Sequence, residues 1–221
     1  MDIEEGGEGV QAPRKEGYEA ILNEVSSVLP NDFFNFDMNG YEYLRSKVID
    51  PIQTGIPILP QIEAYEAIEF IGRYKSGKSI MSYFVIASVV CSTEVGGLQS
   101  DVAFFDTDRK LNVNVLALII SQRLSSIQDP RKRSQLYNEA LNRVKVYRPK
   151  DMTHLALFLC SIRNNHSYSP RLLVLDSLSA YLYDLGNNEP LQSTFRSILH
   201  HFRCLLREKK CSLILISPST Q

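Results

Sequence analysis

The chain has 221 residues, of which 44% are hydrophobic and 22% charged, and a formal net charge of −1. This is the composition of an ordinary globular protein, long enough to bury one sizeable core, and it excludes a protein that is basic throughout. No apolar run approaches the roughly 18 residues of a membrane helix, and the acidic N-terminus is unlike a secretory signal or a transit peptide.

The first third of the chain is predicted to lead into a domain rather than to form one. Residues 1–17 are rich in Gly and Glu and are expected to be a disordered acidic tail. Residues 18–66 hold two short helical patterns, at 18–29 and 40–48, and then a stretch broken by three prolines. This lead-in is too short for a core of its own, so we expect it to pack on the domain formed by residues 67–221.

A glycine-bounded loop comes next. Residues 72–79 fit the pattern G-x-x-x-x-G-K-[ST] without a mismatch, and the alternative is a Gly-Lys surface turn. A short apolar strand is predicted at 68–71 and an amphipathic helix at 78–91, which is the setting that a phosphate-binding P-loop requires. The predicted nucleotide-binding residues are therefore those of the loop: Gly72, Arg73, Tyr74, Lys75, Ser76, Gly77, Lys78 and Ser79.

The residue types of this loop suit a triphosphate. A helix N-terminus offers free N–H donors and a partial positive charge. Gly72 and Gly77 let the backbone bend around phosphate oxygens, Lys78 is expected to reach the β- and γ-phosphates, and Ser79 is expected to bind Mg²⁺. The bulky side chains of residues 73–75 either point outward or narrow the pocket.

Beyond the loop, apolar segments alternate with helical patterns. Near-continuous apolar strands separated by helices predict an α/β fold with a mostly parallel, twisted sheet covered by helices on both faces. Ligands of such sheets bind at the carboxyl ends of the strands. Strands are predicted at 68–71, 102–105, 144–147, 172–176 and 212–216, and helices at 78–91, 113–124, 151–163 and 191–206.

Acidic residues stand at the ends of two of these strands. Asp176 closes an apolar strand about 100 residues after the loop, where a Walker B carboxylate would bind Mg²⁺ together with Ser79; the alternative is a helix-capping Asp. A hydrolytic ATPase also needs a group that orients water, and Asp108 and Gln221 are the candidates by position. Because Asp is shorter than Glu by one methylene, we expect nucleotide binding more than brisk turnover.

In order and spacing, these motifs resemble the RecA-like recombination ATPases, and among them the eukaryotic recombinase paralogues of the X-ray-repair cross-complementing type. The resemblance covers residues 67–221. It is carried by the loop, by Glu94-Val95-Gly96-Gly97-Leu98, by the two strand-end segments 104–108 and 172–180, and by Ser219-Thr220-Gln221.

The resemblance implies a P-loop NTPase core that binds ATP and Mg²⁺, in a nuclear protein of homologous recombination repair of DNA double-strand breaks. It implies a hetero-complex with other recombinase-paralogue subunits that helps the recombinase to load on single-stranded DNA, and at most a weak DNA-linked ATPase. Lys78 and Ser79 would hold nucleotide and Mg²⁺, Asp176 would be the Walker B acid, Asp108 would stand at the catalytic-Glu position and Gln221 at the γ-phosphate-sensing position.

The chain departs from the family pattern in three places. Asp108 replaces Glu, which places hydrolysis in doubt. The loop at 183–189 carries two acids and no base, so direct DNA contact there is unfavourable, and we expect DNA to be reached through the complex. The family's second DNA-binding loop and last strands would come after Gln221, so we expect a shortened form or a sheet edge left for a partner.

Two interpretations of a basic stretch remain open. Residues 131–150 hold seven Lys or Arg and one Glu, a local balance of +6. They form either a patch for nucleic acid or an acidic partner, or a solvated helix and loop. At the level of function, an assembly subunit with a nucleotide site competes with an autonomous ATPase or phosphotransferase and with a structural member that no longer uses nucleotide.

Overall fold

The computed structural model describes residues 49–177, 181 and 189–218. The predicted acidic tail at 1–17, the helical patterns at 18–29 and 40–48, most of the loop at 183–189 and the candidate residue Gln221 lie outside the described residues.

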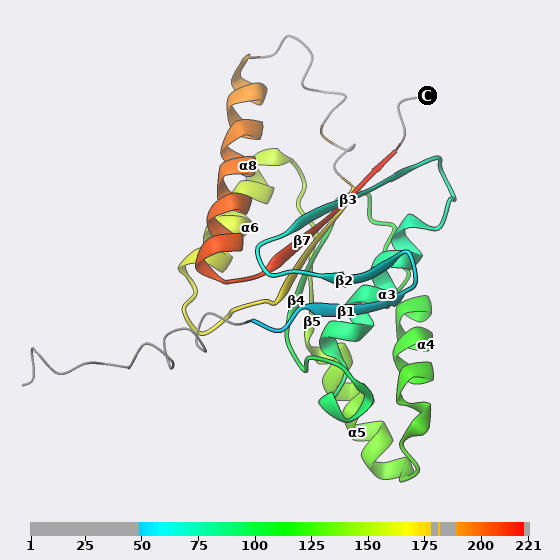
Figure 1. Ribbon diagram of the computed structural model, residues 1–221. Coiled ribbons are helices and arrows are strands. Elements are labelled where there is room, and N and C mark those ends of the chain that lie inside the picture. The colour runs from blue at the N-terminus through cyan, green and yellow to red at the C-terminus, as the bar shows by residue number, and fades with distance from the viewer. Residues whose placement is uncertain (1–48, 178–180, 182–188, 219–221) are drawn as a thin grey trace, which may run out of the picture. The chain divides into compact units, whose positions relative to one another are not determined.

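Five parallel strands form the central sheet, in the order β3-β7-β6-β4-β5 (Figure 1). Every residue of β4 and β6 is buried, because both strands lie inside the sheet and are covered on both faces. The predicted parallel α/β sheet is thereby confirmed. The strands are β3 (Ala67–Gly72), β4 (Val102–Asp106), β5 (Val144–Tyr147), β6 (Leu172–Asp176) and β7 (Ser212–Pro218).

Helices cover both faces of this sheet (Figure 1). Successive residues of a strand point to opposite faces, so Phe104 packs in the core beneath α3 and α4 while Phe105 packs in the core beneath α6 and α8. One face carries α3 (Lys78–Val90), α4 (Val113–Arg123) and α5 (Pro130–Asn142), and the other carries α6 (Met152–Asn164) and α8 (Glu189–Glu208).

The parallel register brings the carboxyl ends of the strands to one edge of the sheet. Asp106 of β4 pairs with Asp176 of β6, and Gly72 of β3 pairs with Pro218 of β7. The loop after β3, the acids after β4 and the end of β6 therefore meet where sequence reasoning placed them.

A β-hairpin occupies part of the predicted lead-in, a feature that the three prolines conceal in the sequence. Its strands are β1 (Ile52–Ile56) and β2 (Leu59–Ile62), paired antiparallel. Ile52 and Ile62 are fully buried against α3 and its neighbours. The hairpin is therefore part of the packed core on that face of the sheet.

Short elements complete the described chain: the 3-10 helices η1 (Thr93–Val95) and η2 (Leu124–Ser126). Within the described ranges, no helix is long and apolar enough to cross a lipid bilayer.

Candidate functional site

The loop between β3 and α3 is shaped by its second glycine. Gly77 adopts a φ of +89°, in the left-handed region that favours glycine, and stands at the N-cap of α3. No side chain of the described residues caps this helix end, and its first turn holds no acid. The N-terminus of α3 therefore presents backbone N–H donors and a partial positive charge to the space enclosed by the loop.

Lys78 places a cation inside this loop. Its Nζ donates to the carbonyl oxygens of Gly72, at 2.6 Å, and of Arg73, at 2.8 Å. The Lys78 ammonium, at the start of α3, is thus hydrogen-bonded to the first two residues of the loop. The same side chain lines the adjoining cavity, so its charge is available to a bound anion.

Ser79, one residue further, faces the acid at the end of β6. The Ser79 hydroxyl donates to Asp176 Oδ2 at 2.7 Å, although the two residues are 97 positions apart in the sequence. A hydroxyl and a carboxylate at this separation are ligands of the kind that Mg²⁺ takes alongside phosphate oxygens. The structure brings together the two predicted metal ligands.

Asp176 is held in a low-dielectric position, with a relative exposure of 9%. Burial is the main cause that raises the pKa of its carboxyl above the ordinary value, and the Ser79 hydrogen bond opposes it; the nearby acids Asp108 and Asp106 raise the pKa further. A dication bound beside the carboxylate would offset this unfavourable charge.

Thr107 ties the ends of β4 and β6 together. Its hydroxyl donates to the carbonyl oxygen of Ser177 at 2.7 Å and accepts from the Ser177 backbone N–H at 2.7 Å. Its own backbone N–H donates to the carbonyl oxygen of Asp176 at 3.0 Å. These bonds fix the spacing between Asp176 and Asp108, the residue next to Thr107 in the chain.

Asp108 lies in the site and is paired. Lys110 Nζ lies 3.0 Å from Asp108 Oδ2, and the Ser177 hydroxyl donates to the same oxygen at 3.3 Å. The Asp108 side chain is 24% exposed and that of Lys110 is 61% exposed. The Asp108 hydrogen bond and the Asp108 charge raise the pKa of Lys110.

The segment that carries this pair is anchored by Asp106, a buried acid that sequence reasoning left without a role. Asp106 Oδ1 accepts from the backbone N–H groups of Lys110, at 2.8 Å, and Leu111, at 3.2 Å. Its Oδ2 accepts from Arg148 Nε at 3.2 Å. Asp106 therefore shapes the turn after β4 and thereby directs the Lys110 side chain.

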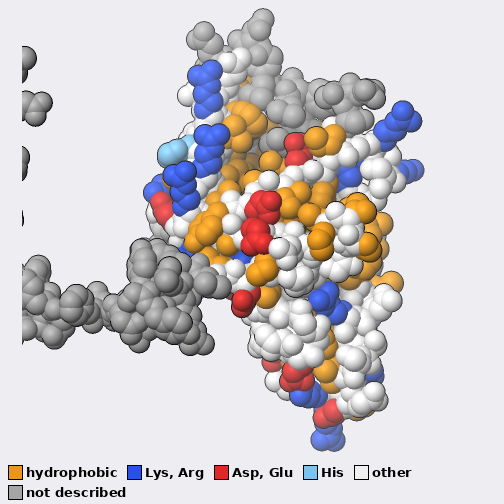
Figure 2. Space-filling model, viewed as in Figure 1, with side chains coloured by type: hydrophobic (Ala, Val, Ile, Leu, Met, Phe, Trp, Pro, Cys, Tyr) orange, Lys and Arg blue, Asp and Glu red, His pale blue; other side chains and the backbone are white. Residues whose placement is uncertain are grey.

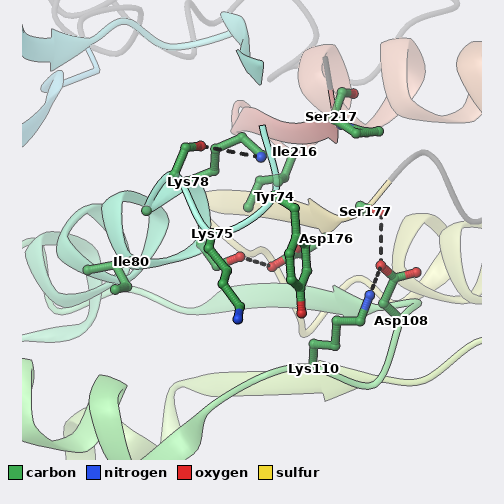
Figure 3. Close-up of a pocket in the computed structure, with 14 residues that line it drawn as sticks. Tyr74, Lys75, Lys78, Ile80, Asp108, Lys110, Asp176, Ser177, Ile216 and Ser217 are labelled. Atoms are coloured by element: carbon green, nitrogen blue, oxygen red, sulfur yellow. Dashed lines mark hydrogen bonds and ion pairs between the residues drawn. The ribbon is translucent and has the colours of Figure 1, made fainter. Parts of the chain in front are cut away.

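A cavity of about 650 Å³ connects these groups, a size within the range of small-ligand sites. Figure 3 shows Lys78 on one side of it and the Asp108–Lys110 pair on the other, with Asp176 between them in this view. Tyr74 and Lys75 line the cavity, whereas the exposed Arg73 side chain does not. Two of the three bulky loop side chains thus narrow the pocket. Its lining is Tyr74, Lys75, Ser76, Gly77, Lys78, Ser79, Ile80, Asp108, Lys110, Asp176, Ser177, Ile216, Ser217 and Pro218.

The wall formed by β7 carries an unpaired polar atom. Ser217 is 6% exposed, lines the cavity, and its Oγ has no hydrogen-bond partner among the described residues. The open helix end, Lys78 and the Ser79–Asp176 pair together fit a phosphate chain carrying Mg²⁺.

The structure thus places in one site every predicted residue that it describes, apart from the Arg73 side chain; Gln221 lies outside the described residues. Lys110 was missed, whereas Ser177 and Ser217 follow predicted strands whose ends were expected at this edge, without an assigned role. The position of Lys110, two residues after the strand-end acid Asp108, was the available signal. No group of three or more His, Cys, Asp and Glu side chains suited to a metal ion occurs in the described ranges.

The basic stretch at 131–150 divides between α5 and the region of β5, and several of its cations have local partners. Lys132 forms an ion pair with Glu94 at 2.7 Å, and Arg143 forms one with Glu139 at 3.3 Å. Arg148 forms an ion pair with Asp106. Lys145 donates to a backbone carbonyl. Much of the positive charge of this stretch is therefore bound by groups of the protein itself.

A search against protein-family models finds no match to the chain.

Proposed function

We propose that this protein binds ATP with Mg²⁺ through a P-loop formed by residues 72–79. The observation that carries the proposal is the Ser79–Asp176 contact of 2.7 Å at the mouth of a loop that also holds Lys78. A glycine-bounded turn, a helix N-terminus, a lysine and a hydroxyl–carboxylate pair are together what a Mg²⁺–triphosphate needs.

In this proposal each group of the chain has one task. The N–H groups at the start of α3 and the Lys78 ammonium bind phosphate oxygens. Ser79 and Asp176 hold Mg²⁺, which would neutralise phosphate charge and fix the geometry of the phosphate chain. Tyr74 offers its ring at the rim, where it is 76% exposed.

The experiment is equilibrium binding of a fluorescent ATP analogue to the full-length chain, with Mg²⁺ or with EDTA. Binding should require Mg²⁺ and should fall by at least an order of magnitude in Lys78→Ala, because a charge-assisted contact to phosphate is lost. Lys145→Ala, which removes a lysine bonded only to the backbone carbonyl of Asn142 in the described structure, is the matched control. Binding that is unchanged in Lys78→Ala would contradict the proposal.

We further propose that the nucleotide-bound protein is an accessory subunit of a nuclear recombinase-paralogue complex that acts in homologous recombination repair. The order of the motifs along the chain supports this assignment. The pairing of Asp108 with Lys110 also favours assembly over rapid hydrolysis, because the candidate water-orienting carboxylate is engaged by a cation.

Two measurements separate this role from that of an autonomous ATPase or phosphotransferase. Affinity purification of the tagged chain from cells should recover other recombinase-like subunits. Steady-state hydrolysis by the purified chain should be slow with and without single-stranded DNA. A robust rate from the chain alone, with no such subunits recovered, would favour the autonomous enzyme.

A further inference from the structure

The outer face of α8 carries a row of arginines. Arg196, Arg203 and Arg207 are exposed, and at 3.6 residues per turn they fall within about 40° of one another around the helix. The opposite face of α8 holds Ile198, Phe202 and other apolar side chains that pack on the sheet. Figure 2 shows Lys and Arg side chains one after another along the helix that Figure 1 labels α8. These three residues are called the arginine row below.

The arginine row is not neutralised within the described part of the fold. None of its members has an ion pair there, and the acid next to Arg207, Glu208, is held by Arg163 through two hydrogen bonds of 2.6 and 2.8 Å. The basic stretch at 131–150 differs, since much of its charge is paired locally. Its unpaired Arg131 and Arg133 are two residues apart on α5 and so point to different sides of that helix.

We propose that the arginine row is a binding surface for the phosphate backbone of single-stranded DNA. It runs from Arg196 to Arg207, 11 residue steps along the helix or about 16 Å, in a nearly straight line. A linear polyanion matches a linear row of cations. The guanidinium group suits phosphate in particular, because it donates two parallel hydrogen bonds to it.

Binding by this surface is independent of base sequence. Neither Phe195 nor Phe202 of α8 is exposed, so no phenyl ring of this helix is available for base stacking. The arginine row lies outside the nucleotide cavity and shares no residue with it. Only the choice of DNA as the nucleic acid rests on the proposed function.

The test is fluorescence anisotropy of labelled single-stranded oligonucleotides of two unrelated sequences, with the full-length chain, over a range of salt concentrations. The triple variant Arg196→Gln/Arg203→Gln/Arg207→Gln should bind both sequences on the order of tenfold more weakly at low salt. Three lost phosphate contacts should also reduce the slope of log K against log salt by about 2.

The matched control is Arg131→Gln/Arg133→Gln/Lys150→Gln, which removes the same charge from exposed positions outside α8. It should keep the wild-type slope. Thermal melting confirms that both variants fold, and retention of ATP-analogue binding by the α8 variant separates this proposal from the nucleotide site.

Three results would overturn the proposal: no measurable binding of single-stranded DNA by the wild type at low salt, an equal loss in the two triple variants, or an unchanged slope in the α8 variant. Loss of a protein subunit in affinity purification of the α8 variant, with DNA binding intact, would instead assign the arginine row to an acidic protein.

Discussion

At the scale of single residues, Asp176 illustrates a conflict between stability and ligand binding. Burial raises the pKa of the Asp176 carboxyl group, so this group binds a proton more tightly in the folded protein than in the unfolded chain. The ionised form therefore destabilises the fold above the raised pKa, and this effect disappears as the pH falls through the raised pKa toward the ordinary value near roughly 4.

Asp176→Asn should consequently melt at a higher temperature than the wild type at neutral pH without ligand, while losing Mg²⁺-dependent nucleotide binding. The amide oxygen can still accept from Ser79. The advantage in Tm should shrink as the pH is lowered, because the wild-type carboxyl then becomes protonated. Melting curves at several pH values measure it, and a difference in Tm that does not vary with pH would show that the cause is something other than the charge.

Lys110 should distinguish ATP from ADP if the cavity binds nucleotide. It lies on the wall opposite the loop, beside the carboxylates where the far end of a triphosphate would arrive, and its Nζ is 5.9 Å from the centre of the Tyr74 ring. In Lys110→Met, the affinity for MgATP should fall roughly tenfold or more, and that for MgADP should stay within about twofold.

Lys110→Arg is the conservative comparison, since it keeps the charge and should keep most of the preference for the triphosphate. An equal loss of both nucleotides in Lys110→Met would assign Lys110 a general electrostatic role and would leave the proposed nucleotide site intact.

At the scale of elements, the predicted strands and helices agree with the structure where the sequence carries a strong period. β4 and β6 are nearly continuous apolar runs because both of their faces are covered. The helices that cover the sheet repeat apolar residues every three or four positions. The hairpin was missed because β1 and β2 have five and four residues, and Pro51, Pro57 and Pro60 suggest a broken segment.

The sequence predicts those parts of the site that belong to a recognisable motif. The loop and Asp176 are deduced from a pattern and from a strand end, and the parallel sheet explains why they meet. Lys110 belongs to no pattern, and its place in the cavity depends on the turn that Asp106 shapes. For Ser217, the end of the strand predicted at 212–216 indicates the edge of the sheet, but its place in the cavity wall depends on how far β7 extends.

The hairpin should contribute to global stability as a core element does. Ile52→Ala removes a fully buried side chain beside α3 and should lower the free energy of unfolding by about 2–5 kcal/mol. Ile58→Ala, in the turn of the same hairpin, is the matched control because Ile58 is 84% exposed. Urea denaturation measures both; similar midpoints for Ile52→Ala and wild type would mean that the hairpin does not unfold together with the sheet.

At the scale of the whole molecule, the cavity joins elements that are far apart in the chain. Groups from β3, α3, β4, β6 and β7 or their adjoining loops line it, so a ligand there contacts most of the sheet's carboxyl edge. A ligand that binds only the folded state stabilises the entire cooperative unit by RT ln(1 + [L]/Kd), so the gain grows with the logarithm of the ligand concentration above Kd.

MgATP should therefore raise the thermal stability of the whole domain. At a concentration 100 times its Kd, the gain is about 2.7 kcal/mol. Differential scanning fluorimetry with MgATP, with Mg²⁺ alone and with EDTA measures the shift, and Lys78→Ala should reduce it, by about half for a tenfold weaker Kd. A shift of the same size in Lys78→Ala would place the ligand elsewhere on the protein.

The strand that leads into the loop is hydrogen-bonded to one neighbour, β7, among the described strands, and forms the border of the sheet. Its outward amide protons should therefore exchange with deuterium earlier than those of β6, which is flanked on both sides. Lys78 lines the cavity and donates to the carbonyl oxygen of Gly72 at the carboxyl end of this strand, so a ligand that binds Lys78 would restrain the strand through that hydrogen bond. The slowing of deuterium uptake along β3 would thus report occupancy of the site without any label on the ligand.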